Sequence, residues 1–104
     1  MPMFQAHDVK EFSSSKFVFK ILIRSSQAQC RLYCLEPGQT LPVHQHEAAV
    51  DVFQVVEGLG ELTLDDEVHT VGPGMVILIP PYQAHGMTNP GPERLVFTSV
   101  YIQK

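Results

Sequence analysis

Glycine and proline interrupt this chain so often that only short secondary-structure elements fit between them. The 104 residues include seven glycines and eight prolines. Between these residues, apolar side chains recur at the two-residue period of a β-strand, and no long helical period appears. Residues 17–24 show the alternation clearly, with Phe17, Phe19 and Ile21 on one face. The pattern predicts an all-β protein.

About eight or nine short strands are expected, at regular spacing. The predicted segments are residues 17–24, 28–35, 41–46, 51–56, 60–64, 68–71, 75–79 and 95–102. The polar run of residues 65–67 is expected to close a hairpin. Many short strands at such spacing are typical of a sandwich or a barrel. Residues 1–16 are expected to form an irregular N-terminal segment, in which 7–12 is either a single helical turn or irregular chain.

Length and composition indicate one globular domain, residues 1–104. Hydrophobic residues make up 44% and charged residues 17%, a balance that disordered chains do not have. The net charge of −4, with scattered basic residues, argues against binding nucleic acid or an acidic membrane surface. The longest apolar run, residues 75–79, is too short to cross a bilayer, and no signal segment is recognised. A cytoplasmic protein is therefore expected.

The two cysteines, Cys30 and Cys34, stand four residues apart on one face of a predicted strand. At about 3.3 Å per residue their Cα atoms lie about 13 Å apart. A disulfide needs less than about 7 Å. The two cysteines are therefore expected to be small buried apolar residues rather than a redox pair.

Two histidines on an extended segment are the first sign of a metal site. His44 and His46 are two residues apart, so their rings are expected to project from the same face. Two imidazoles on Cα atoms about 6.6 Å apart can converge on one ion. His85 follows a proline-rich segment, where a loop from another part of a barrel could bring it inward. Imidazole suits Zn, Cu, Fe and Ni, so the histidines do not select a metal.

The spacing of these histidines resembles the two sequence motifs of the cupin superfamily. The matching residues are Gly38, His44, His46, Asp51 and Gly58 for the first motif, and Gly74, Pro80, His85 and Asn89 for the second. The motifs together cover residues 38–89. The resemblance, to small single-domain cupins of the RmlC-like type, implies a double-stranded β-helix, or jelly-roll barrel. It also implies one divalent transition-metal ion (Fe, Mn, Ni, Zn or Cu), held by three histidines and one acidic residue.

Asp51 and Tyr82 depart from the cupin pattern. Asp51 stands where cupins usually have the longer glutamate, and it faces the histidines only if the backbone turns or bulges before it. It is either the fourth ligand, directly or through water, or it falls short and water completes the shell. Tyr82 replaces a glycine. It is either an ordinary loop residue or a phenol over the barrel mouth that donates a hydrogen bond to a bound anion.

Apolar residues near the motifs are expected to line or fill the barrel, and in cupins such residues also shape the substrate pocket. The candidate pocket residues are Phe53, Met75, Tyr82 and Phe97. An apolar lining favours an apolar or aromatic ligand.

Two functions are compatible with this sequence, and no catalytic residue is assigned. The first is a metal-dependent enzyme, dioxygenase-like or isomerase-like, that acts on a small organic molecule. The second is a non-catalytic module that binds a metal or a small ligand as a sensor or store. A homodimer is expected because residues 14–24 include an alternating strand that can add to a partner's sheet, and small cupins commonly form dimers. Metal loss is expected on acidification toward about pH 5, because ligand histidines must be neutral.

Overall fold

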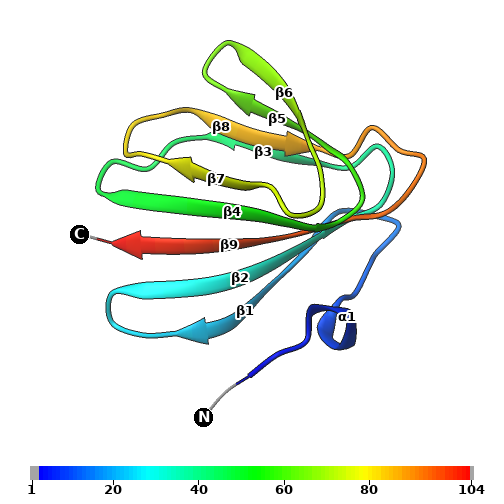
Figure 1. Ribbon diagram of the computed structural model, residues 1–104, viewed down its shortest axis with the longest axis horizontal. Coiled ribbons are helices and arrows are strands. Elements are labelled where there is room, and N and C mark those ends of the chain that lie inside the picture. Colours follow the sequence, from blue (N-terminus) through cyan, green and yellow to red (C-terminus); the bar gives the residue numbers. More distant parts are fainter. Residues whose placement is uncertain (1–2, 104) are drawn as a thin grey trace.

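Two antiparallel β-sheets pack face to face in the computed structural model, which describes residues 3–103 (Figure 1). The first sheet has five strands in the order β1-β2-β9-β4-β7, and the second has four in the order β3-β8-β5-β6. The elements are α1 (Ala6–Val9), β1 (Val18–Arg24), β2 (Ala28–Leu35), β3 (Thr40–His44), β4 (Ala49–Glu57), β5 (Gly60–Leu64), β6 (Glu67–Val71), β7 (Val76–Ile79), β8 (His85–Thr88) and β9 (Leu95–Gln103). Within residues 3–103, no helix has the length and apolar character that a membrane span needs.

Strands that follow one another along the chain often lie in opposite sheets. β3 belongs to the second sheet, β4 to the first and β5 to the second again. All of the pairings between neighbouring strands are antiparallel. This arrangement is the double-stranded β-helix that the resemblance implied, and the predicted fold class is confirmed.

The apolar alternation located most of the strands. The predicted segments 28–35 and 60–64 coincide with β2 and β5, and the others agree within two residues at each end. The predicted hairpin joins β5 and β6, with Asp65 in the left-handed region at φ 53°. The pattern missed β8, because Gly86 interrupts its short alternation.

An apolar core fills the space between the two sheets. It consists of Tyr33, Leu35, Leu41, Phe53, Val55, Leu62, Val71, Ile79, Met87, Leu95 and Phe97. Both sheets contribute to it, because alternate residues of each strand face inward. Two of the four candidate pocket residues, Phe53 and Phe97, belong to this core.

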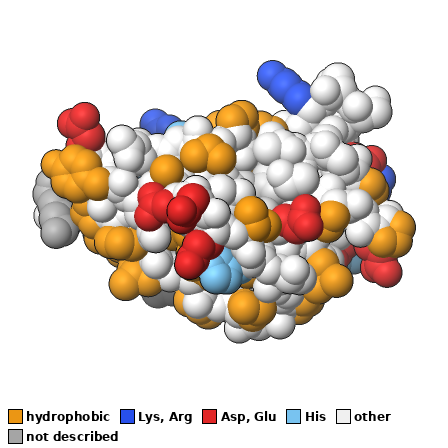
Figure 2. All heavy atoms as spheres, turned by 90° about the horizontal axis from the view of Figure 1, so that it is seen from above, with side chains coloured by type: hydrophobic (Ala, Val, Ile, Leu, Met, Phe, Trp, Pro, Cys, Tyr) orange, Lys and Arg blue, Asp and Glu red, His pale blue; other side chains and the backbone are white. Residues whose placement is uncertain are grey.

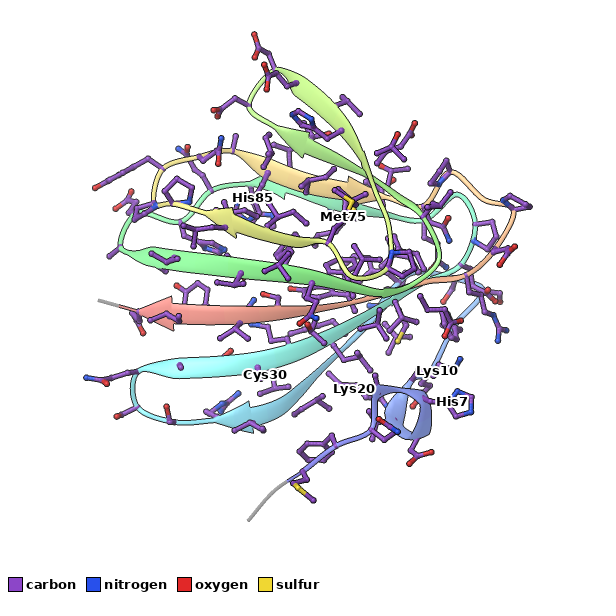
Figure 3. All side chains as sticks on the ribbon, viewed as in Figure 1. His7, Lys10, Lys20, Cys30, Met75 and His85 are labelled. Atoms are coloured by element: carbon purple, nitrogen blue, oxygen red, sulfur yellow. The ribbon has the colours of Figure 1, made fainter. Side chains whose placement is uncertain are left out.

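The N-terminal segment covers the outer face of the first sheet. Ala6, Val9 and Phe12 pack against a second buried cluster, formed by Leu32, Cys34 and Val96. Two ion pairs hold this segment against the sheet, and Figure 3 shows their lysines, Lys10 and Lys20, close to α1. Lys10 pairs with Glu57 at 2.7 Å, and Lys20 pairs with Glu11 at 3.0 Å. The segment is therefore part of the folded domain, although it has only one helical turn.

Cys30 and Cys34 are both free thiols on β2, as predicted from their spacing. Cys34 is fully buried and Cys30 is partly buried. Burial raises the pKa of both thiols, because a thiolate is poorly solvated there. The cysteines therefore have the structural character expected for them.

Met75 does not line the barrel, and its prediction as an interior residue is wrong. It lies in the turn before β7, where its N–H donates to the carbonyl of Gly72 at 3.1 Å. Its side chain is 46% exposed, and its sulfur accepts a hydrogen bond from the Gly72 N–H. The strand begins one residue later than the apolar run suggested, because the tight turn after Gly72 includes Met75.

Candidate metal centre

Three histidines from two paired strands and the loop beside them meet at one end of the barrel. His44 ends β3 and His85 begins β8, and the two residues are direct partners in the β3–β8 ladder. His46 follows His44 by two residues. The ring centroids lie 4.3 Å apart for His44 and His85, 5.0 Å for His44 and His46, and 5.3 Å for His46 and His85. One nitrogen from each ring lies within 4.8 Å of the other two, a group that could hold a metal ion.

Backbone carbonyl groups fix the tautomers of two of these histidines. Nδ1 of His44 lies 2.8 Å from the carbonyl oxygen of Pro42, and Nδ1 of His85 lies 2.9 Å from that of Gln83. A carbonyl oxygen can only accept, so in each ring Nδ1 carries the hydrogen. The neutral ring then has a free lone pair on Nε2, which is the arrangement of metal-ligating histidines.

Two of the Nε2 atoms are buried without a hydrogen-bond partner. They belong to His46 and His85, and within residues 3–103 no protein group satisfies them. His85 is fully buried, with its side chain between the two sheets (Figure 3). An unsatisfied polar atom in the interior costs about 1–3 kcal/mol, so such atoms usually mark a place for a ligand or an ion. The three histidines thus fit a metal ion.

Asp51, on β4, brings a carboxylate to the same place. It is only 2% exposed, and its Oδ1 accepts a hydrogen bond from the hydroxyl of Ser99. Its Oδ2 lies 3.6 Å from Nε2 of His46 and 3.9 Å from Nε2 of His85. A short bend at residues 47–48 connects β3 in one sheet to β4 in the other. Asp51 therefore faces the histidines across the barrel, and the strand alternation counted from His46 does not apply to it.

The site favours the neutral form of His46 and His85. Burial lowers the pKa of His46 and of His85 below the ordinary value of 6.5, because a charged imidazole is poorly solvated there. The neighbouring His44 lowers both pKa values further, whereas the carboxylate of Asp51 raises them. Neutral imidazole is the form that binds metal.

Aromatic side chains form the inner boundary of the site. The ring of Phe53 meets that of His85 edge-on at 5.7 Å, and Phe97 packs behind Phe53 at 5.1 Å. Met75 is not brought to the site. Its carbonyl accepts from the N–H of Val55, toward the opposite end of β4 from Asp51.

Tyr82 contacts the site through its backbone. Its N–H donates to the carbonyl of His46 at 2.7 Å, and its φ of 71° lies in the left-handed region. Glycine adopts that region without strain, which explains why the family pattern has glycine at this position. The side chain is 65% exposed, and its hydroxyl makes no hydrogen bond within the described part of the chain.

Two residues near the site, Ser99 and Arg31, were not predicted from the sequence, whereas Tyr101 was expected among the residues that line or fill the barrel. Tyr101 meets the ring of His46 edge-on at 4.8 Å, and the guanidinium carbon of Arg31 lies 4.5 Å from the centre of the Tyr101 ring. Ser99 shares the inward alternation of Phe97 and Tyr101. A hydroxyl on an apolar inward face is a signal that could have identified it.

A family model described as Cupin domain matches residues 31–101. This match covers more than half of the chain, so the protein belongs to the cupin family. The barrel and the histidine cluster agree with that membership, and the predicted family is confirmed.

Solved structures with a similar fold include small RmlC-like cupins. An RmlC-like cupin from Desulfovibrio desulfuricans is 24% identical, with a TM-score of 0.88 over 98% of this chain and 96% of that one. A conserved Klebsiella pneumoniae protein with a double-stranded β-helix domain is 24% identical, with a TM-score of 0.92 over 97% of this chain and 84% of that one. At this identity the likeness concerns the fold.

One curated relative matches over part of its length. It is the uncharacterized protein MJ1618 of Methanocaldococcus jannaschii, 35% identical over 54 residues. Those residues are 52% of this chain and 43% of the relative, so the match spans less than half of the longer protein.

Proposed function

We propose that this cupin binds one divalent transition-metal ion through Nε2 of His44, His46 and His85. Asp51 completes the set, directly or through a water molecule. The proposal depends above all on the relation between His85 and Asp51. Nε2 of His85 carries a lone pair, and it faces the carboxylate oxygen Oδ2 of Asp51 at 3.9 Å. Two acceptors that face each other in the interior are unfavourable unless a cation or a hydrogen-bond donor lies between them.

A proton is the alternative cation, but it would satisfy fewer atoms. A proton on Asp51 can serve only one acceptor, whereas three imidazole nitrogens converge here. A divalent ion is satisfied by several lone pairs at once, at about 2.0–2.1 Å from each nitrogen. Three nitrogen donors with a carboxylate suit Fe, Mn, Ni, Zn or Cu, and the donor set alone does not choose among them.

The site has an accessible side, which favours chemistry on a small organic molecule over a purely structural ion. The side chain of His46 is 22% exposed, and His44 is only partly buried. A bound ion would supply Lewis-acid or, if redox-active, dioxygen chemistry at a position that the protein leaves open. The chain's own residues hold the ion, keep the imidazoles neutral and exclude water through the aromatic wall of Phe53 and Phe97.

Metal titration of the purified protein tests this proposal. The protein is prepared without a histidine tag, stripped with a chelator and titrated with each of the five metals. We expect one equivalent of at least one metal to bind, and His44→Ala to weaken that binding at least tenfold. The control is His69→Ala. His69 is exposed on β6 and pairs with Glu67 at 3.2 Å. Figure 2 shows a histidine beside a group of acidic side chains on the face of the molecule seen there.

Two results would contradict the metal site. One is a wild-type protein that binds none of the five metals at stoichiometric level. The other is a His44→Ala variant that binds metal as the wild type does. Oxygen consumption by the loaded protein, measured with small phenols and diketones, then separates a dioxygenase from a non-catalytic binding module.

A further inference from the structure

The guanidinium of Arg31 lies beside the proposed metal centre, and within the described residues 3–103 it has no acidic partner. Arg31 extends from β2, where it is the direct ladder partner of Ser99 on β9. Ser99 in turn holds Asp51. Arg31 also lies over the ring of Tyr101, and that ring contacts His46. A single residue therefore separates Arg31 from the site in two directions: Ser99 toward Asp51, and Tyr101 toward His46.

The hydrogen-bonding capacity of Arg31 is largely unused. One terminal nitrogen donates to the hydroxyl of Tyr33 at 3.3 Å, and Nε is buried without a partner. None of the ion pairs within residues 3–103 includes Arg31. Because a guanidinium has five donors and stays charged, this arrangement leaves a fixed positive charge ready to receive an anion.

An aromatic surface continues from the guanidinium along the same face of the first sheet. The rings of Phe19 and Tyr33 stack at 5.4 Å, and those of Tyr33 and Phe97 stack at 4.9 Å. Phe19 is 47% exposed, and Ile21, the ladder partner of Arg31, is 38% exposed. A ligand that reaches Arg31 therefore also meets an apolar, partly open surface.

We propose that Arg31 binds the carboxylate of a small organic acid whose body is aromatic or otherwise apolar. The planar fork of a guanidinium matches a carboxylate in two parallel hydrogen bonds. Asp51 already adds negative charge nearby, and one guanidinium balances a singly charged carboxylate better than a phosphate. The body of the ligand packs along the aromatic surface, and its other end faces the histidines. This last point rests on the proposed metal-binding function.

Binding of matched acids and amides tests the assignment. The probes are acetate, benzoate and phenylacetate, each compared with acetamide, benzamide or phenylacetamide, which have the same shape without the charge. Nitrogen–proton spectra of the arginine Nε–H groups report binding in both the metal-free and the zinc-loaded protein. We expect at least one acid to bind tenfold or more tightly than its amide, and to shift the Arg31 signal.

Three variants complete the experiment. Arg31→Met keeps the length of the stem and is expected to remove the preference for the acid over its amide. Arg31→Lys keeps the charge without the fork and is expected to restore only part of that preference. Arg24→Met, an exposed arginine on β1, is the control and is expected to bind as the wild type does. If the Arg31 variants do not fold, the proposal is tested by whether an acid shifts the Arg31 Nε–H signal of the wild type.

The outcomes separate this proposal from the metal site. The proposal is overturned if no acid is preferred over its amide, if the Arg31 signal does not respond, or if folded Arg31→Met keeps the preference. If metal binding fails while the Arg31-dependent preference for an acid holds in the metal-free protein, the carboxylate site stands without the metal.

Discussion

Ser99 on β9 donates its hydroxyl hydrogen to Oδ1 of Asp51 on β4, and both residues are buried. The bond joins neighbouring strands diagonally, because the direct ladder partner of Asp51 is Tyr101. With Oδ1 occupied, Oδ2 is the oxygen that faces the imidazoles of His46 and His85. Ser99 thus determines which oxygen of Asp51 is available to the metal centre.

Removal of this hydroxyl tests its role in positioning Asp51. We expect Ser99→Ala to weaken metal binding by about 10- to 100-fold, the usual effect of losing a group that orients a ligand. The metal-free protein is expected to lose about 1–3 kcal/mol of stability, because the buried Oδ1 loses its donor. Competition with a chelator measures the affinity, and urea unfolding measures the stability.

Thr98→Ala is the matched control for that variant. Thr98 precedes Ser99 on the same strand, and its hydroxyl donates to the backbone carbonyl of Gln54 at 3.5 Å rather than to Asp51. Its loss is expected to leave metal affinity unchanged. Equal affinities for Ser99→Ala and the wild type would show that Asp51 needs no help from Ser99.

Asp51→Asn is expected to move stability and metal affinity in opposite directions. An asparagine can still accept from Ser99 through its oxygen, while its amide donates to a histidine Nε2 that is otherwise unsatisfied. The metal-free protein should therefore gain about 1 kcal/mol. Metal binding should weaken at least tenfold, because the amide offers no negative charge. Urea unfolding and chelator competition give the two values.

Asp66→Asn, in the exposed turn between β5 and β6, is the control for the loss of one negative charge. It is expected to change neither the stability of the metal-free protein nor its metal affinity. If metal-free Asp51→Asn is less stable than the wild type, Oδ2 of Asp51 and the histidine Nε2 atoms are not acceptors that face each other. Unchanged metal affinity would place Asp51 outside the ligand set.

The histidine cluster could be predicted from the sequence because its members stand at strand ends that the motif spacing fixes. His44 and His46 adjoin the end of β3, and His85 begins the strand that pairs with it. The position of Asp51 could not be derived from alternation. The chain changes sheets between His46 and Asp51, so the two side chains meet across the barrel rather than along one strand.

Arg31 and Ser99 escaped prediction for a different reason. They belong to β2 and β9, which pair although most of the chain lies between them. The register of such a distant pair depends on the whole barrel, and one sequence does not contain it in any short pattern. Met75 shows a local limit, since an apolar run does not reveal that its first residue belongs to a turn.

Stability of the metal-free protein is expected to fall as the pH is lowered from 7 toward 5. Burial lowers the pKa of His46 and His85, so both remain neutral in the folded state where the unfolded chain already takes up protons. Below about pH 6.5 the unfolded state binds more protons, and acid therefore favours unfolding. Above that pH these histidines contribute no pH dependence. Urea unfolding at a series of pH values measures the effect.

Two variants assign this pH dependence to the site. His46→Gln is expected to reduce it, whereas His69→Ala at the exposed pair with Glu67 is expected to leave it unchanged. The loaded protein should release its metal as the pH falls toward about 5, because protons compete for the same nitrogens. If the free energy of unfolding is constant between pH 7 and 5.5, burial does not hold His46 and His85 in the neutral form.

The exposed edge of the first sheet leads us to propose a homodimer. β1 is one of the two edge strands of this sheet, and its side chains Phe19, Ile21 and Ile23 are 47%, 38% and 40% exposed. An unpaired edge with apolar side chains is suited to pairing with a second copy. Light scattering after size-exclusion chromatography is expected to give the mass of a dimer at micromolar concentration. Ile23→Lys should shift it toward the monomer, whereas Val68→Lys, at the exposed edge strand β6, should not. A wild-type protein that is monomeric under these conditions would refute pairing through β1. If Ile23→Lys remains a dimer, the interface does not involve β1.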